Sequence, residues 1–130
     1  GEPAADCGAR INQCRACVCV PPVERWTEAE DCADQQAEYD VENGAHAGWG
    51  DICDPSGWAQ NECPGWGSEE QVIDGCLQMM FDEGPADSSC PEWCVEKGHH
   101  INMTKPSYTR VACGFHTTGD GEVWSVQNFE

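Results

Sequence analysis

Two adjacent histidines, His99 and His100, directly follow Gly98 in a chain of 130 residues that contains only four histidines. Imidazole is the side chain best suited to bind a transition metal or to transfer a proton near neutral pH. Two interpretations are open. Either one ring packs in the interior while the other lies exposed, or one ring belongs to a site whose other members lie elsewhere in the chain.

The carboxylate of Glu83 is a second candidate for a functional site, because its helical phase could turn it toward the core. Ser68 and Gln71 form a capping box that starts a helix, and a Gly-Pro pair ends it after Glu83. At about 100° per residue, Glu83 lies roughly 20° from Val72, within the apolar stripe that faces the core. The phase allows an inward carboxylate, but the last turn of a helix can equally turn out to water.

Eleven cysteines are the third group that could do chemistry. Their density is typical of disulfide-stapled proteins of an oxidising compartment. We therefore expect disulfides, and a secreted protein whose signal peptide has been removed. A cysteine zinc site is the alternative, but the Cys-x-x-Cys of residues 14–17 has no second pair with matching spacing.

The odd number of cysteines leaves at least one thiol without a partner inside the chain. We expect that thiol to be Cys7 or a member of the cluster Cys14, Cys17 and Cys19. Bridges between such near neighbours are uncommon, so the other members should reach distant partners. The leftover thiol could link two chains into a homo-oligomer, or it could be a buried free cysteine.

The elements that must position these residues are helices followed by strands. Apolar spacing and end signals predict helices over residues 27–43 and 68–83, with a further short helix near 10–17. Residues 1–10 are expected to form a flexible N-terminal segment, and 44–67 and 86–98 to form irregular loops.

Two strand patterns close the chain, at residues 108–115 and 122–129, with the turn sequence TTGDG between them. They predict an antiparallel hairpin in which Val111, Cys113 and Phe115 share one face. Helices together with an antiparallel hairpin predict a single α+β domain.

The charge of the chain narrows the class of partner. It has 24 acidic and 6 basic residues, a formal net charge of −18. That field repels nucleic acids and anionic lipids, so we expect neither as a partner. No apolar stretch approaches the roughly 18 residues of a membrane span.

In their order and spacing these motifs resemble those of the CAP superfamily of cysteine-rich secretory, antigen 5 and pathogenesis-related proteins. The segments that carry the likeness are INQCR, VPPVERW, CADQQAEYD, QNECPGWGS, MMFDEG, GHHINM, YTRVACGF and EVWSVQNF. Together they run from about Ile11 to Phe129. The resemblance implies that residues 11–130 form a disulfide-rich, three-layer α-β-α sandwich with an antiparallel sheet.

The resemblance also implies a cleft in which two histidines and two glutamates converge. The matching residues are His46, Glu62, Glu83 and His99. His100 takes the place of the family's tyrosine, so we expect it to pack beside the site.

Three family positions carry other residues in this chain. Ile11 replaces a histidine, Met80 an aromatic residue, and Cys63 the asparagine that follows the family's glutamate. Asn102 takes the place of a glutamine and begins a glycosylation sequon, which we interpret as incidental. Trp49, Trp58 and Trp66 either fill the small core or line a carbohydrate-binding or apolar groove.

Two imidazoles and two carboxylates suit a divalent cation, zinc more than magnesium or calcium. The expected function is an extracellular binding domain whose ligand is a protein, a lipid or a carbohydrate. The alternatives are a metal-dependent, peptidase-like hydrolase and a self-assembling extracellular structural subunit. No activated nucleophile is recognisable, which leaves the catalytic residues unknown and favours a protein without enzymatic activity.

Overall fold

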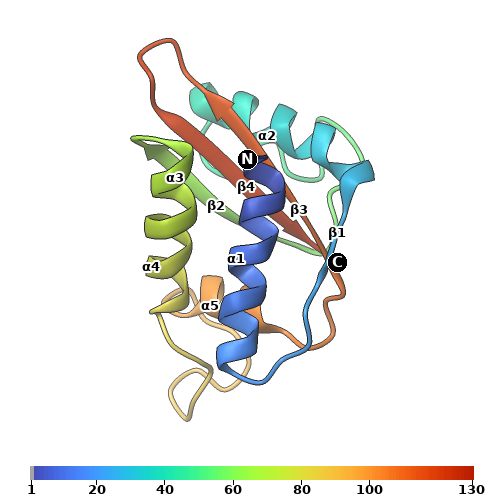
Figure 1. Ribbon diagram of the computed structural model, residues 1–130, viewed down its shortest axis with the longest axis vertical. Coiled ribbons are helices and arrows are strands. Elements are labelled where there is room, and N and C mark those ends of the chain that lie inside the picture. The colour runs from blue at the N-terminus through green and yellow to red at the C-terminus, as the bar shows by residue number, and fades with distance from the viewer. Residues whose placement is uncertain (1) are drawn as a thin grey trace.

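The computed structural model describes residues 2–130, and Gly1 lies outside the described part of the chain. The helices are α1 (Pro3–Cys17), α2 (Glu30–Asn43), α3 (Glu69–Gln71), α4 (Leu77–Phe81) and α5 (Gly98–Thr104). A 3₁₀ turn, η1 (Thr27–Ala29), precedes α2, and a π-helical turn, η2 (Val72–Cys76), joins α3 to α4. The strands are β1 (Glu24–Arg25), β2 (Ala59–Trp66), β3 (Arg110–Thr117) and β4 (Val123–Phe129) (Figure 1).

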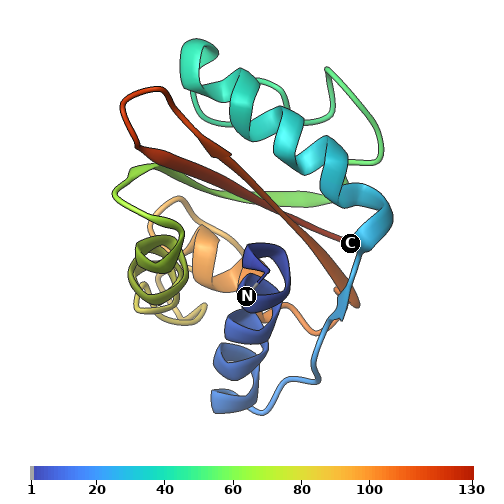
Figure 2. The same ribbon diagram turned by 45° about the horizontal axis from the view of Figure 1, so that its top comes forward.

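The four strands form one sheet in the order β1-β3-β4-β2. The predicted hairpin of β3 and β4 is present, β2 pairs antiparallel with β4, and the two residues of β1 pair parallel with β3. Helix α2 covers one face of the sheet, and α1, α4 and α5 lie on the other (Figure 2). The predicted α-β-α sandwich is therefore confirmed.

Helix α2 lies close to the sheet where small side chains face each other. Ala29, Ala33 and Ala37 of η1 and α2 pack against Ala112 of β3. A Cβ at Gly114 would collide with the backbone of Ala33, so helix and strand are in close contact there. Only small residues permit such an approach.

The other layer holds the larger side chains. Its core includes Ile11, Leu77, Met80, Met103 and Phe129. The expected alternation along β3 is confirmed, since one set of its side chains joins this core and the other set joins the α2 layer.

The N-terminal segment differs from the expectation. The predicted flexible segment of residues 1–10 is helical from Pro3 onward, as part of α1. Cys7, Ile11 and Cys14 recur at helical spacing and are buried, and Cys7 is bridged to Cys113 of β3. A proline in the first turn is compatible with a helix start. Helical phase and a disulfide thus hold this segment against the sheet.

The structure contains four disulfides, and three cysteines of the described chain remain unbridged. The bridges are Cys7–Cys113, Cys32–Cys53, Cys63–Cys76 and Cys90–Cys94. Cys14, Cys17 and Cys19 are free. The leftover thiols belong to the expected cluster and not to Cys7, the other place considered. The expectation that cluster members reach distant partners is wrong.

Two of the longer elements were not predicted. Strand β2 lies in the stretch expected to be loop, where Pro64 and Gly65 shift its register against β4 between Cys63 and Trp66. Helix α5 spans only seven residues and includes both adjacent histidines. Neither element has the regular apolar spacing from which helices and strands are predicted.

Candidate functional site: a pocket lined by two histidines

Four segments that are far apart in the sequence surround a pocket of about 190 Å³. They are the loop after α2, strand β2, the loop before α5, and α5 itself. The lining residues are His46, Gln60, Trp93, Val95, Gly98, His99 and Asn102. His46 and His99, two of the four residues expected in a cleft, thus share one pocket.

Glu83 makes three hydrogen bonds to the start of α5, two of which position His99. One carboxylate oxygen accepts the backbone N–H groups of His99 (3.0 Å) and His100 (3.3 Å) at the first turn of α5. The other oxygen lies 2.7 Å from Nδ1 of His99. Because the first N–H groups of a helix have no partner within it, Glu83 caps α5 and orients the imidazole at the same time.

His46 is held mainly through its backbone. The residue has a φ of 65°, and its N–H donates to Glu62 (2.7 Å) and to Asp40 (3.1 Å). Asp40 also accepts the N–H of Gly48 at 2.8 Å. Two buried carboxyl groups therefore fold the loop after α2 around His46.

Gln60 determines which nitrogen of His46 faces the pocket. Its amide nitrogen donates to Gln36 (3.0 Å) and to Asn128 (2.9 Å), so its oxygen is left to accept from Nδ1 of His46 at 2.7 Å. Nδ1 of His46 thus carries a proton, and the lone pair of a neutral ring lies on Nε2. Such outer partners commonly orient metal-binding histidines.

The Glu62 carboxyl group is buried beneath this loop. Its side chain is 1% exposed, and Nδ1 of His46 is 3.8 Å from one of its oxygens. Burial, together with the neighbouring carboxylate of Asp40, raises the pKa of Glu62 to about 9. Glu62 is therefore neutral near pH 7 and can donate its proton to Asp40. A neutral, buried carboxyl group is a poor ligand for a cation.

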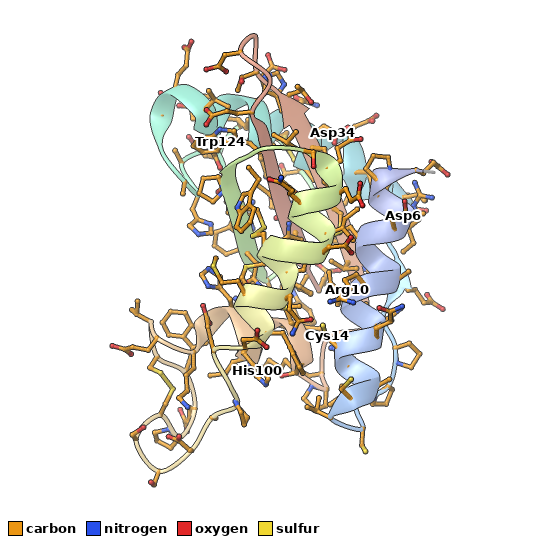
Figure 3. The ribbon with its side chains drawn as sticks, turned by 60° about the vertical axis from the view of Figure 1, so that its left-hand side comes forward. Asp6, Arg10, Cys14, Asp34, His100 and Trp124 are labelled. Atoms are coloured by element: carbon orange, nitrogen blue, oxygen red, sulfur yellow. A yellow bond between two sulfur atoms is a disulfide. The ribbon has the colours of Figure 1, made fainter. Side chains whose placement is uncertain are left out.

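His100 has the packing role that the sequence suggested. It is buried, its ring stacks on Phe81 with 4.8 Å between the ring centroids, and its Nδ1 lies 2.5 Å from the Phe81 carbonyl oxygen. Figure 3 shows His100 near the lower ends of α4 and α5. Of the two adjacent histidines, one packs in the interior and the other lines the pocket.

The side chain of Asn102 is also hydrogen-bonded within the protein. Its side-chain nitrogen, to which a glycan would be attached, donates to Asn61 at 3.0 Å, and Asn61 in turn donates to the carbonyl of His99 at the same distance. These bonds connect β2 to α5 at the edge of the pocket.

The four expected site residues form two pairs, each of one histidine and one glutamate. Glu83 binds the ring of His99, and Glu62 binds the backbone of His46. Across residues 2–130, no three side chains of His, Cys, Asp or Glu are grouped so that they could hold a metal ion. Both glutamates are already used to position the histidines, so the donor set facing the pocket consists of two imidazoles.

Trp93 is a pocket residue that the sequence did not indicate. It belongs to the loop closed by the Cys90–Cys94 disulfide and is 56% exposed. A Cβ at Gly98 would collide with its indole, so the ring packs directly on the start of α5. Trp49, Trp58 and Trp66 were candidates for a groove or for the core. Trp58 is exposed, and none of the three lines this pocket.

Gln60 and Asp40 were missed as well. Both lie in segments that carry the family resemblance, Asp40 at the end of CADQQAEYD and Gln60 at the start of QNECPGWGS, but neither was singled out as a site residue. Gln60 stands two positions before Glu62 on β2, and such spacing places both side chains on one face of a strand. That spacing is the signal that could have identified Gln60.

Comparison with known proteins agrees with this architecture. The model of the CAP family, described as the cysteine-rich secretory protein family, matches residues 9–129. No curated protein has a sequence significantly similar to the chain.

Two solved structures have a similar fold. The structure of venom allergen-like protein 4 of Schistosoma mansoni (SmVAL4) has a TM-score of 0.74 and 13% identity, covering 99% of this chain and 88% of that one. MpPR-1i has a TM-score of 0.61 and 17% identity, covering 95% of this chain and 86% of that one. At these identities, the structural likeness shows the fold alone.

Proposed function

Because this chain belongs to the CAP family of cysteine-rich secretory proteins, we propose that it is an extracellular binding domain whose ligand site is the His46–His99 pocket. Eight of its eleven cysteines are bridged, which suits an oxidising compartment. In residues 2–130, no helix combines the length and the apolar character needed to cross a membrane.

The observation that carries the proposal is the shared pocket itself. His46 and His99 come from different segments, and a hydrogen-bonding partner holds Nδ1 of each ring. No hydrogen bond among the described residues uses either Nε2 atom. Their side chains are 44% and 37% exposed, so a ligand can reach them.

The size of the pocket limits the ligand. At about 190 Å³ it is smaller than the roughly 300–1,000 Å³ of typical small-molecule sites. It suits a hydrated cation, or one group that projects from a larger partner. The exposed side chains of Trp93 and Val95 would then contact the apolar part of that partner.

A divalent cation, zinc above all, is the proposed cofactor. His46 and His99 would hold it, and Glu62 and Glu83 would act as positioning residues. Bound zinc would offer open coordination positions to a carboxylate or carbonyl group of the partner. Two protein ligands predict weaker binding than at a structural zinc site, which has four.

Calorimetric titration with zinc chloride tests the cation. We expect weak binding that His46→Ala and His99→Ala each reduce at least about tenfold. His116→Ala is the matched control, since His116 lies on β3, outside the pocket, and its variant should bind zinc like the parent. Binding should also weaken when the pH is lowered from about 7.5 to 5.5, because a protonated imidazole cannot bind a metal.

Two results would remove zinc from the proposal: no heat at millimolar protein, or an equal loss in all three variants. The pocket itself is tested by nuclear magnetic resonance, with a small-molecule fragment library as the probe. Fragments that bind there should shift the imidazole signals of His46 and His99 and leave those of His116 unchanged. If every binding fragment shifts only the signals of other residues, the pocket is not the ligand site.

The hydrolase alternative would depend on a water molecule bound to the proposed zinc. The lining of the pocket, within the described residues, has no hydroxyl or thiol side chain that could act as a nucleophile instead.

A further inference from the structure

The three unbridged cysteines lie together where α1 ends. Cys14 is 4% exposed and belongs to the main core, whereas Cys17 and Cys19 are exposed. Figure 3 shows Cys14 on the side of α1 that faces α4. Every other cysteine is already in a disulfide, so an intrachain bridge could use only members of this cluster. Because three is an odd number, at least one thiol must stay free or bond outside the chain.

Arg15 joins this end of α1 to the segment that follows α5. Its guanidinium donates to the carbonyl oxygens of Pro21 (2.7 Å), Met103 (3.0 Å), Lys105 (3.1 Å) and Tyr108 (3.2 Å). The two segments run side by side at one end of the molecule (Figures 1 and 2). We call their exposed residues the thiol end. These residues are Ala16, Cys17, Val18, Cys19, Pro21, Pro22, Lys105, Pro106 and Ser107.

The thiol end is free of acidic residues in a strongly acidic protein. Residues 7–23 and 98–119 contain no Asp or Glu, although the chain carries 24 of them. Arg15 is 1% exposed and is bonded to carbonyl oxygens, so its positive charge has no carboxylate partner there. Lys105 lies over the ring of Tyr108, and no ion pair of the described residues uses it. Asp82, on the α4 side, is the acidic group near Cys14.

The lack of acidic residues at the thiol end favours a second copy of this chain as the partner that binds there. Two molecules of net charge −18 repel each other, and the repulsion is weakest where the basic residues of each cancel the field. Contact through the thiol end keeps the acidic surfaces of both copies apart. Val18, Pro21 and Pro22 add exposed apolar area at the same place. Exposed thiols at such a contact would meet the same thiols of the other copy.

We propose that Cys17 and Cys19 at the thiol end join two copies of this chain through disulfide bonds, giving a covalent homodimer. The oxidant is a small disulfide such as oxidised glutathione. A protein thiolate attacks it, forms a mixed disulfide and releases one glutathione thiol. The thiolate of the second copy then displaces the other glutathione. Each link oxidises two protein thiols and reduces one glutathione disulfide to two thiols, which take up the two protons.

Cys14 is not the linking residue. It is buried in the core, and burial raises the pKa of its thiol, so little of it is the reactive thiolate. Cys14→Ser should therefore form the dimer as readily as the parent chain.

The test is oxidation of the full chain in a glutathione redox buffer, followed by alkylation and non-reducing electrophoresis. We expect a band at twice the chain mass that a reductant converts to monomer. Cys17→Ser/Cys19→Ser should remain monomeric. Because both residues are exposed and unbridged, that variant should fold like the parent, as circular dichroism can check.

Peptide mapping identifies the bond. Trypsin cleaves after Arg15 and Arg25, so Cys17 and Cys19 leave on one peptide and Cys14 on another. A linked pair of 16–25 peptides supports the proposal. Any of four outcomes overturns it: a monomer with both thiols alkylated, a bridge within one chain, glutathione adducts alone, or a dimer that persists in the double variant.

The contact surface is tested by the rate of dimer formation. Ser107→Glu puts an acidic group into the thiol end of each copy, and at low salt it should slow dimer formation at least about twofold. Thr117→Glu makes the same change at the exposed end of β3 and is the matched control. Equal rates for both variants would show that the copies meet elsewhere.

Discussion

The two histidines of the pocket are held in different ways. On the His46 side, the supporting carboxyl groups of Asp40 and Glu62 are buried, and the ring contacts an amide, that of Gln60. On the His99 side, the supporting Glu83 is partly exposed and binds the ring directly. One side is thus a buried hydrogen-bond network, and the other is a solvent-accessible carboxylate–imidazole pair.

This contrast predicts which side of the pocket contributes to folding stability and which side affects mainly the pocket. A buried polar group that loses its partner costs much more free energy than an exposed one, because water cannot replace the lost bond. The His46 side should therefore govern folding and its pH dependence. The His99 side should tolerate substitution and affect mainly the pocket.

The largest effect is expected for Asp40→Ala. It removes the acceptor of the Gly48 N–H group and one of the two acceptors of the His46 N–H group inside the protein. We expect the free energy of unfolding to fall by about 2–4 kcal/mol, as measured by urea denaturation followed through tryptophan fluorescence. Asp40→Asn keeps one acceptor oxygen, so its free energy of unfolding should fall by less. A loss below about 1 kcal/mol for the alanine variant would contradict the role of Asp40.

The second effect is a dependence of stability on pH through Glu62. Its pKa is raised from 4.5 to about 9, so between these values the folded chain holds a proton that the unfolded chain releases. This contribution to stability is complete below about pH 4.5 and is lost as the pH rises towards 9. Glu62→Gln keeps an acceptor for the His46 N–H and a donor for Asp40 without titrating.

Glu62→Gln should therefore match the parent near pH 4.5 and exceed it near pH 8.5, by at least about 2 kcal/mol in free energy of unfolding. Urea denaturation at both pH values measures this difference. A variant less stable than the parent at the higher pH would show that Glu62 is ionised in the folded state.

A smaller effect is expected for Glu83→Ala on the other side of the pocket. The change removes the cap of α5 where water can partly replace it, so we expect a loss of about 1 kcal/mol in free energy of unfolding. Glu83→Gln retains an acceptor and should cost less. If thermal or urea unfolding gave Glu83→Ala a loss as large as that of Asp40→Ala, the two sides would not differ.

The smallest effect on stability is expected for His99→Ala. The His99 side chain is partly exposed, so the free energy of unfolding should change by no more than about 0.5 kcal/mol. Zinc binding should weaken at least about tenfold in the same variant. A loss above about 1.5 kcal/mol would identify the ring as a structural element of the core rather than a ligand-binding group.

Local signals in the sequence succeeded only where local contacts decide the structure. The Ser68 cap is present, with its hydroxyl accepting the Gln71 N–H at 3.0 Å. The Thr27 cap, identified by the same rule, is absent, because the chain enters α2 through the 3₁₀ turn η1 and makes no side-chain cap there. The neighbouring strand β1 pairs with β3, and this long-range pairing sets where the helix begins.

Sequence-based prediction of the candidate site succeeded and failed for the same reason. The helical phase of Glu83 left the direction of its carboxylate open. In the structure Glu83 follows the end of α4, and its contacts with the start of α5 orient the carboxylate. His46 and Glu62 were reached only through the family resemblance, because a loop histidine and a glutamate within a polar stretch have no local pattern. Gln60 and Trp93 were missed, since their roles depend on contacts with residues distant in the sequence.

By itself, the sequence determined that this protein is an acidic, disulfide-rich α+β domain with an unpaired thiol, since composition, periodicity and an odd cysteine count are properties of the chain alone. Only the tertiary structure decided which thiols remain free. Cys7 pairs with Cys113 because a helix brings it against β3, whereas Cys17 and Cys19 lie past the end of that contact. Bond formation depends on distance in space, and for residues far apart along the chain the packing of helix on sheet sets that distance.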